Sequence, residues 1–141
     1  METETRTAAG KRHNPASVWP VPEAFRAIYA HAVETPAGRR LLFVSGQLGI
    51  APDGTLAQGF GAQCEQAMGN VERLLETAGM TGADLVKVVY YLTRTEDLPS
   101  LGEVRRRRWG TGAPPSVTTL VVAALARPDA LVEIEAVAAA P

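Results

Sequence analysis

Two carboxylates near the end of the chain are the residues whose spacing most directly suggests chemistry. Glu133 and Glu135 are two residues apart in an apolar, strand-like stretch, so their side chains project to the same face of the strand. If that face is buried, desolvation and the like-charged neighbour both raise a carboxyl pKa toward a value useful for proton transfer. The alternative is a solvated face of an edge strand, and the pattern alone favours this alternative.

The strongest charge cluster is the run of four arginines at residues 105–108, which is followed by Trp109. Basic residues beside an aromatic ring suggest binding to nucleic acid. On a helix, however, four consecutive arginines cover all sides, and Glu103 can pair with Arg107 at i,i+4. We therefore favour a solvated helix over a nucleic-acid site.

The single cysteine and the two histidines give weaker indications of a catalytic or metal-binding site. Cys64 lies among apolar positions of a predicted helix, which indicates a core residue rather than a nucleophile, because a reactive thiolate needs an electropositive setting. His13 and His31 are too far apart in the pattern to suggest a metal site, and we interpret His31 as structural.

Composition narrows the class of protein. The 141 residues are 46% apolar and 21% charged, which is typical of one globular domain, and the formal charge is −1. This balance gives no overall attraction to nucleic acid or to an acidic membrane surface. No apolar run reaches the roughly 18 to 20 residues of a membrane span, and the polar, acidic start does not look like a secretion signal. A cytoplasmic location is the expectation.

The elements that must position these residues follow from local pattern. Residues 1–22 contain several prolines and no helical or strand period, and we expect an N-terminal arm that is ordered only if Trp19 docks. A single domain should follow over residues 23–141. It starts with a hairpin, residues 28–33 and 41–44, joined by a turn that contains Pro36 and Gly38.

Helical spacing predicts a helix over residues 60–79, with Gly79 at its end. A valine- and tyrosine-rich strand should follow over residues 85–92. A second helix should start with Asp97 as its cap and Pro99 in its first turn, and end near Trp109. Residues 117–125 and 131–138 are predicted to be the last two strands.

This order predicts an α+β fold with a mixed six-stranded sheet and both helices on one face. Two helices cannot cover both faces of such a sheet, so the other face should meet a second subunit.

Four stretches carry a resemblance to a known family: residues 29–33 (YAHAV), 42–47 (LFVSGQ), 78–87 (Ala-Gly, then DLVK) and 131–136 (LVEIEA). Together they resemble the Rid family, also called YjgF-like or L-PSP endoribonuclease-like, over about residues 29–138. The resemblance implies a chorismate-mutase-like homotrimer with a central β-barrel, outer helices and a small-molecule cleft at each subunit boundary. In the best-understood members these clefts hydrolyse imines and enamines derived from amino acids, without a metal or an organic cofactor. Other members have been described as ribonucleases, chaperones or translation inhibitors.

The resemblance also assigns roles at the cleft. Glu133 matches a glutamate that is proposed to orient or activate water. Tyr29 matches a phenol that closes one wall, while Ser45 and Gly46 match a turn that presents a hydroxyl and backbone donors. Thr118 and Thr119 match positions whose hydroxyl or thiol groups face the ligand.

Two positions depart from the family pattern. The deaminases hold the substrate carboxylate with an arginine in a Pro-x-Arg-Ser/Thr string at the start of the family's fifth strand, and Val117 stands at that position in this chain. An aliphatic side chain cannot replace a planar guanidinium fork, so carboxylate recognition should weaken by on the order of 100-fold. Gly102 stands where deaminases often have asparagine. Replacement of the missing clamp by Arg105 or Arg108 is a lesser hypothesis.

Three functions stay open at this point. The first is an enzyme that acts on an uncharged or differently anchored imine, enamine or related reactive intermediate. The second is a metabolite-binding or regulatory trimer without chemistry. The third, RNA binding or cleavage through the arginine helix, is the least favoured.

Overall fold

The computed structural model describes residues 3–6 and 9–141, so residues 1, 2, 7 and 8 of the expected arm lie outside the described part. Its strands are β1 (Thr3–Arg6), β2 (Lys11–Asn14), β3 (Ala32–Glu34), β4 (Arg40–Leu48), β5 (Leu85–Leu92), β6 (Ser116–Val121) and β7 (Val132–Ala140). Its helices are α1 (Phe60–Thr77) and α2 (Leu98–Trp109), with single 3-10 turns at Glu23–Phe25, Gly82–Asp84 and Thr95–Asp97. No helix in these ranges is long and apolar enough to cross a membrane.

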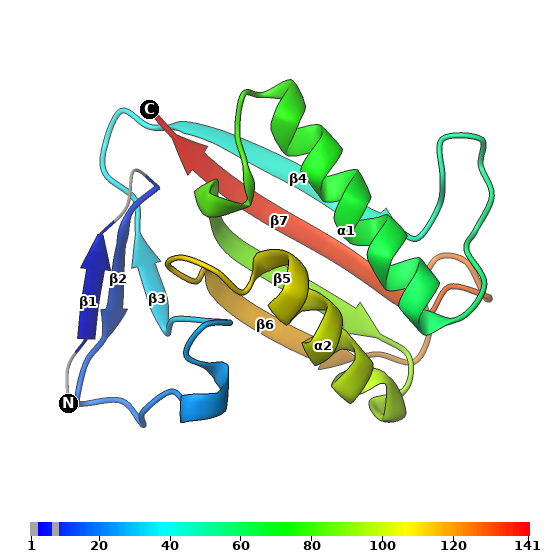
Figure 1. The fold of residues 1–141 in the computed structure, drawn as a ribbon, viewed down its shortest axis with the longest axis horizontal. Coiled ribbons are helices and arrows are strands. Elements are labelled where there is room, and N and C mark those ends of the chain that lie inside the picture. The colour runs from blue at the N-terminus through cyan, green and yellow to red at the C-terminus, as the bar shows by residue number, and fades with distance from the viewer. Residues whose placement is uncertain (1–2, 7–8) are drawn as a thin grey trace.

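Four strands form the main sheet in the order β4-β7-β5-β6. β7 runs antiparallel to both of its neighbours, whereas β5 and β6 are parallel and α2 forms the connection between them. Both helices lie on one face of this sheet (Figure 1). The predicted α+β class, mixed sheet and one-sided helices are therefore confirmed.

The core lies between α1 and the sheet. Apolar residues at helical spacing on α1, including Met68 and Leu75, are fully buried against alternate residues of β7 such as Ile134. Cys64 belongs to this layer, as predicted, and burial raises the pKa of its thiol to about 12.

Both helix ends fall close to their predicted positions. α1 stops at Thr77, and Gly79 follows with a positive φ of 71°, which a residue without a Cβ adopts at little cost. α2 begins at Leu98, with Pro99 in its first turn. Asp97 is the N-cap residue, as predicted, but its side chain makes no capping hydrogen bond, because its carboxylate accepts hydrogen bonds from the Arg94 guanidinium, at 2.8 and 3.0 Å.

The six-stranded sheet and the first hairpin were predicted incorrectly. β3 does not pair with β4 but with β2, in a separate three-stranded sheet of order β1-β2-β3. The arm was expected to lack strands, yet its β2 offers β3 an antiparallel partner. Ahead of β3, Ala30 makes only a single bridge, to Ser116 of β6.

Arg12 fixes this small sheet to the rest of the molecule. The residue is 2% exposed, and its guanidinium donates to the backbone carbonyls of Pro114 (2.8 Å), Gly10 (3.2 Å), Ala113 (3.4 Å) and Leu85 (3.5 Å). Trp19, by contrast, touches the ring of His31 but stays 63% exposed. The order of the arm therefore depends on β2 and Arg12 rather than on a buried Trp19.

Strand lengths follow the available partners. β6 was expected to continue to residue 125 but ends at Val121, which is paired with Leu92, the last residue of β5. β4 extends beyond the predicted residues 41–44, and its register with β7 shifts between Val44 and Gln47.

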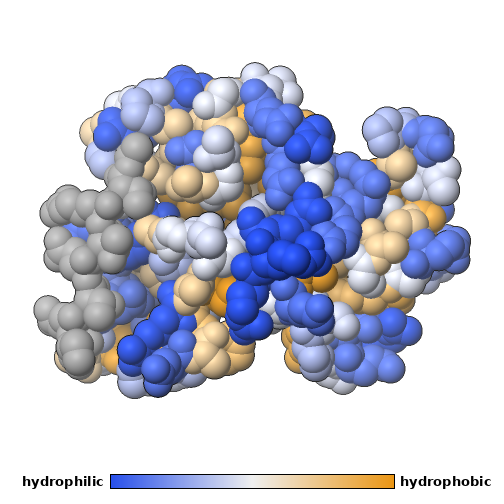
Figure 2. Space-filling view, viewed as in Figure 1, coloured by the Kyte–Doolittle hydropathy of each residue, from blue (hydrophilic) through white to orange (hydrophobic). Residues whose placement is uncertain are grey.

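The sheet has a second face, turned away from the helices, which we call the open face. Strand alternation places Leu41 and Phe43 of β4 on it, together with Glu133 and Glu135 of β7 and Leu120 of β6. Phe43 is 73% exposed and Leu41 is 52% exposed. On the opposite side, hydrophilic side chains cover much of the two helices (Figure 2).

Candidate functional site

Glu133 and Gly46, which were both predicted to line the ligand cleft, lie in direct contact. The carboxylate of Glu133 extends across the irregular part of β4, so that a Cβ added at Gly46 would lie 2.7 Å from the Glu133 carboxyl carbon. Only glycine leaves room for this approach. Ser45 precedes Gly46 on the same strand, and the three residues form one group near the β4 edge of the sheet.

The open face carries further polar groups beside Glu133. The Tyr91 hydroxyl donates a short hydrogen bond to Glu135, and this bond raises the pKa of Tyr91. Lys87 Nζ donates to Thr118 Oγ1 at 3.1 Å. Thr118 therefore belongs to the open face, where Lys87 is a cation that the sequence analysis did not single out.

Val117 and Thr119 project to the other face. Val117 packs against the core, and Thr119 accepts a hydrogen bond at 3.4 Å from Arg105 of α2. Tyr29 joins this second group, because its neighbour Ala30 donates its N–H to the Pro115 carbonyl at 2.8 Å, just before β6. The second group thus lies at the β6 edge of the sheet, on the helix side.

Within one protomer the predicted site residues therefore do not form one site. At a spacing of about 4.8 Å per strand, Ser45 and Gly46 on β4 are about 14 Å from β6, and Glu133 on β7 is about 10 Å from it. Glu133 also faces away from Val117 and Thr119. No ordinary side-chain movement brings these residues together through the sheet.

The arginine run divides into members with different partners. Arg108 bonds to Glu72 at 2.7 Å and to Glu65 at 2.7 Å, and Arg107 also pairs with Glu65. These carboxylates raise the pKa of Arg108. Arg107 pairs with Glu65 of α1 rather than with Glu103, which corrects the predicted i,i+4 pair, and the ion pairs reduce the positive charge available to nucleic acid.

Arg105 is different. Its guanidinium lies 5.4 Å from the ring centre of Tyr90, and its Nε is buried with no hydrogen-bond partner among the described residues. No carboxylate of residues 9–141 forms an ion pair with it, and burial lowers its pKa. Of the two arginines considered as substitutes for the missing clamp, Arg108 is occupied by two glutamates, whereas Arg105 points to the predicted site residue Thr119.

A signal for this orientation is present in the sequence. Leu101, Val104, Arg105 and Arg108 follow the i, i+3, i+4, i+7 spacing of one helix face. The side chains of Leu101 and Val104 are buried, so the same spacing directs Arg105 inward. Treating the four arginines as a uniform solvated surface overlooked this periodicity.

Metal-binding geometry is not found: among the residues that the structure describes, no three His, Cys, Asp or Glu side chains gather closely enough to hold an ion. Tyr29 also borders a cavity of about 290 Å³ that it shares with residues of the N-terminal arm, including Trp19.

Comparisons with known proteins agree with this architecture. A family model described as endoribonuclease L-PSP matches residues 22–140. The 2-iminobutanoate/2-iminopropanoate deaminase of Mus musculus is 31% identical over 140 residues, covering 98% of this chain and 94% of that protein. Protein DfrA of Myxococcus xanthus is 36% identical over 113 residues, covering 78% of this chain and 83% of that one.

Among solved structures, the Rid-family protein YyfB of Yersinia pestis superposes with a TM-score of 0.77 at 31% identity, over 89% of this chain and 94% of that chain. The family match covers nearly the whole chain, and both the sequence relatives and the fold agree with it. The chain therefore belongs to the Rid family, also known as the YjgF-like or L-PSP family.

Proposed function

We propose that the protein is a homotrimer with small-molecule sites at its subunit boundaries, and that it processes an imine- or enamine-like intermediate other than the short 2-imino acids. The single observation that carries the proposal is the division of the site residues. Ser45 and Gly46 lie on the edge strand β4 with Glu133 beside them on β7, and Val117 and Thr119 lie on the other edge strand, β6, with side chains on the opposite face. Two copies that meet edge to edge can combine one group from each.

The open face supports association with a second copy of the chain. Leu41 and Phe43 of β4 are 52% and 73% exposed and Leu120 of β6 is 43% exposed, which is an unusual exposure for large apolar side chains on one face of a sheet. Glu133 and Glu135 lie among them, so association would also remove these carboxylates from water.

In such a site Glu133 is the residue for the chemistry. Hydrolysis of a C=N bond needs a water positioned at the carbon, a group that accepts a proton from this water, and protonation of the departing nitrogen. The Glu133 carboxylate can accept the proton from water and return it to nitrogen. The Glu133 carboxylate occupies the space that a side chain at position 46 would fill, and this close packing against the Gly46 backbone holds it in place.

Val117 sets the substrate preference. Its side chain packs against the core, so neither a fork nor any other hydrogen-bond donor stands where the deaminases have arginine. Arg105 supplies a cation from α2, but it approaches at Thr119, two residues further along β6. We propose that Arg105 holds an acceptor group of the ligand at this different position, which disfavours the carboxylate of a short 2-imino acid.

The test combines assembly with turnover. Sedimentation equilibrium should give three times the monomer mass of 15.0 kDa. Ammonia release from 2-iminopropanoate generated in situ should be about 100-fold slower than with the mouse relative under the same conditions. A monomer in solution, or a rate equal to that of the relative, would overturn the proposal.

Glu133→Gln separates an enzyme from a binding protein. For an enzyme, turnover of a larger imine should fall at least about 100-fold while ligand affinity changes little. A wild-type protein that binds ligand with no turnover of any imine would instead be a metabolite-binding or regulatory trimer.

A further inference from the structure

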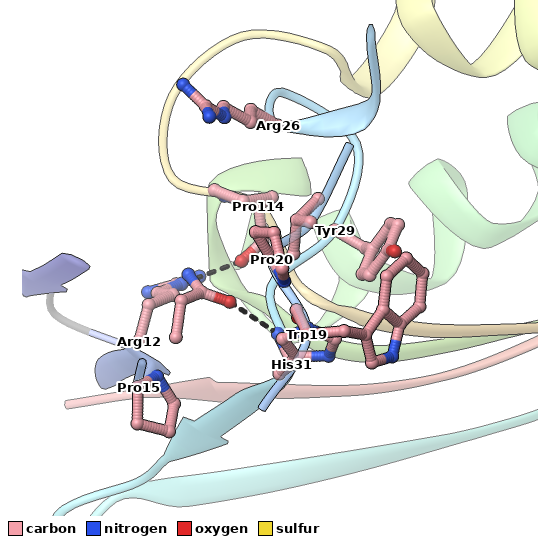
Figure 3. Close-up of a pocket in the computed structure, with 10 residues that line it drawn as sticks. Arg12, Pro15, Trp19, Pro20, Arg26, Tyr29, His31 and Pro114 are labelled. Carbon is pink, nitrogen blue, oxygen red and sulfur yellow. Dashed lines mark hydrogen bonds between the residues drawn. The ribbon is translucent and has the colours of Figure 1, made fainter. Parts of the chain in front are cut away.

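The cavity beside Tyr29 has a lining of unusual composition. It measures about 290 Å³ and lies between the N-terminal arm and the strands that follow it. Ring side chains and prolines make up most of its wall: Trp19, Tyr29, His31, Pro15, Pro20 and Pro114. Figure 3 shows the three rings gathered on one side, with Arg12 on the other and Pro114 between them.

The rings already form an edge-to-face cluster with space for another member. His31 meets Trp19 at 5.5 Å and 65°, and meets Tyr29 at 5.9 Å and 76°. Trp19 nevertheless stays 63% exposed. A planar aromatic ligand would cover the remaining indole surface and continue the same packing.

Hydrogen bonds hold the walls in place before any ligand binds. Asn14 Oδ1 accepts from the His31 N–H at 2.8 Å, and His31 Nε2 bonds to the Trp19 carbonyl oxygen at 2.6 Å. Arg12 ties the arm to Pro114 at 2.8 Å. A preformed pocket loses little conformational freedom on binding, which favours affinity for a small ligand.

The charge of the lining indicates the sign of the ligand. Its ten residues include Arg12 and Arg26 and no aspartate or glutamate. Arg12 is buried and directs its donors to backbone carbonyls, whereas Arg26 is exposed and stands apart from the ring cluster in Figure 3. Arg26 is therefore the guanidinium that can turn toward a ligand carboxylate.

From these observations we propose that the cavity binds a planar aromatic ring that carries a carboxylate. A benzene ring fills a cavity of about 150 Å³, so this one accepts a bicyclic ring or a single ring with a short acidic chain. Six of the ten lining residues precede residue 22, where the family match begins. Most of the pocket lining therefore comes from the N-terminal arm.

The cavity also borders the proposed reaction site. Tyr29 lines it and belongs to the group at β6, to which Ala30 is bridged through Ser116. Assigning the bound molecule as a substrate rests on the proposed function, but binding itself does not.

Isothermal titration with indole-3-acetate tests the site directly. The wild-type protein should bind this probe with a Kd below about 1 mM, and acetate should give no measurable heat. Trp19→Ala should weaken binding about 10-fold or more, because it removes the largest ring. Phe25→Ala removes a nearby exposed ring that does not line the cavity and should leave the Kd unchanged.

The charge assignment has its own comparison. Arg26→Met should weaken binding of indole-3-acetate about 10-fold and leave binding of the neutral indole-3-acetamide nearly unchanged. Arg106→Met, an exposed arginine outside the cavity, is the matched control.

Absence of binding by the wild-type protein at about 5 mM probe, or equal affinity in Trp19→Ala, would overturn the inference. Binding that requires Trp19 in a protein with no turnover of any imine would refute the proposed reaction and leave the pocket standing. Turnover of imines without Trp19-dependent binding would support the proposed reaction and refute the pocket.

Discussion

Replacement of Arg105 by methionine should leave the protein as stable as before or more stable, although it removes a largely buried side chain. Two favourable contacts disappear: a 3.4 Å hydrogen bond to Thr119 and a cation–π contact with Tyr90. Together they contribute about 1 to 2 kcal/mol. Methionine also removes a charge whose Nε has no partner among the described residues, and relief of such desolvation is worth several kcal/mol. We expect the free energy of unfolding to rise by about 1 kcal/mol.

Arg108→Met on the same helix is the control. Arg108 makes three hydrogen bonds, to Glu65 and Glu72, so its loss takes a charged partner away from two half-buried carboxylates and should cost about 2 kcal/mol. Urea unfolding followed by circular dichroism measures both values. A decrease of more than about 1 kcal/mol in the free energy of unfolding of Arg105→Met would refute the reasoning. Arg105 would then be a residue that stabilises the fold, rather than one kept for ligand binding at a cost in stability.

Three further predictions follow from particular contacts. Gly46→Ala should reduce turnover about 10-fold or more, because the added Cβ displaces the Glu133 carboxylate. Gly61→Ala, which has open space around the added Cβ, should keep the wild-type rate. Equal rates of the two variants in a steady-state ammonia assay would contradict this prediction. Arg12→Met should lower the free energy of unfolding by about 3 kcal/mol, since buried carbonyls lose their donor, and should increase hydrogen exchange in β3. Because burial raises the pKa of Cys64 to about 12, the folded protein keeps a proton that the unfolded chain releases above about pH 8.5. The stability from Cys64 is complete below that pH and about 2 kcal/mol smaller at pH 10, so calorimetry should show a smaller fall in Tm from pH 8 to pH 10 in Cys64→Ala than in the wild type.

Local pattern was sufficient for the helices and for most of the central strands. The limits of α1 and α2 follow from apolar spacing, Gly79 and Pro99, all of which act within a few residues. The alternation in β7 likewise placed Glu133 and Glu135 on one face. The family, too, could be recognised from short stretches, and the comparisons confirm it.

Strand pairing was not determined locally. The partner of β3 is β2, which lies about twenty residues earlier in a proline-rich arm, and Arg12 anchors it through carbonyls distant in sequence. No periodicity within either segment encodes that choice, because it depends on which backbone groups and which buried charge can be satisfied together.

By itself the sequence determined which residues face each other along one strand or one helix, since a period of 2 or 3.6 residues fixes direction without any partner. It also determined that Val117 provides no guanidinium. Only the tertiary structure decided that Glu133 and Thr119 lie on opposite faces of the sheet, that Arg105 turns inward while Arg108 is paired, and that the arm encloses a cavity with Tyr29. Strand order, register and the burial of charge are properties of the packed whole, because each depends on segments far apart in the chain.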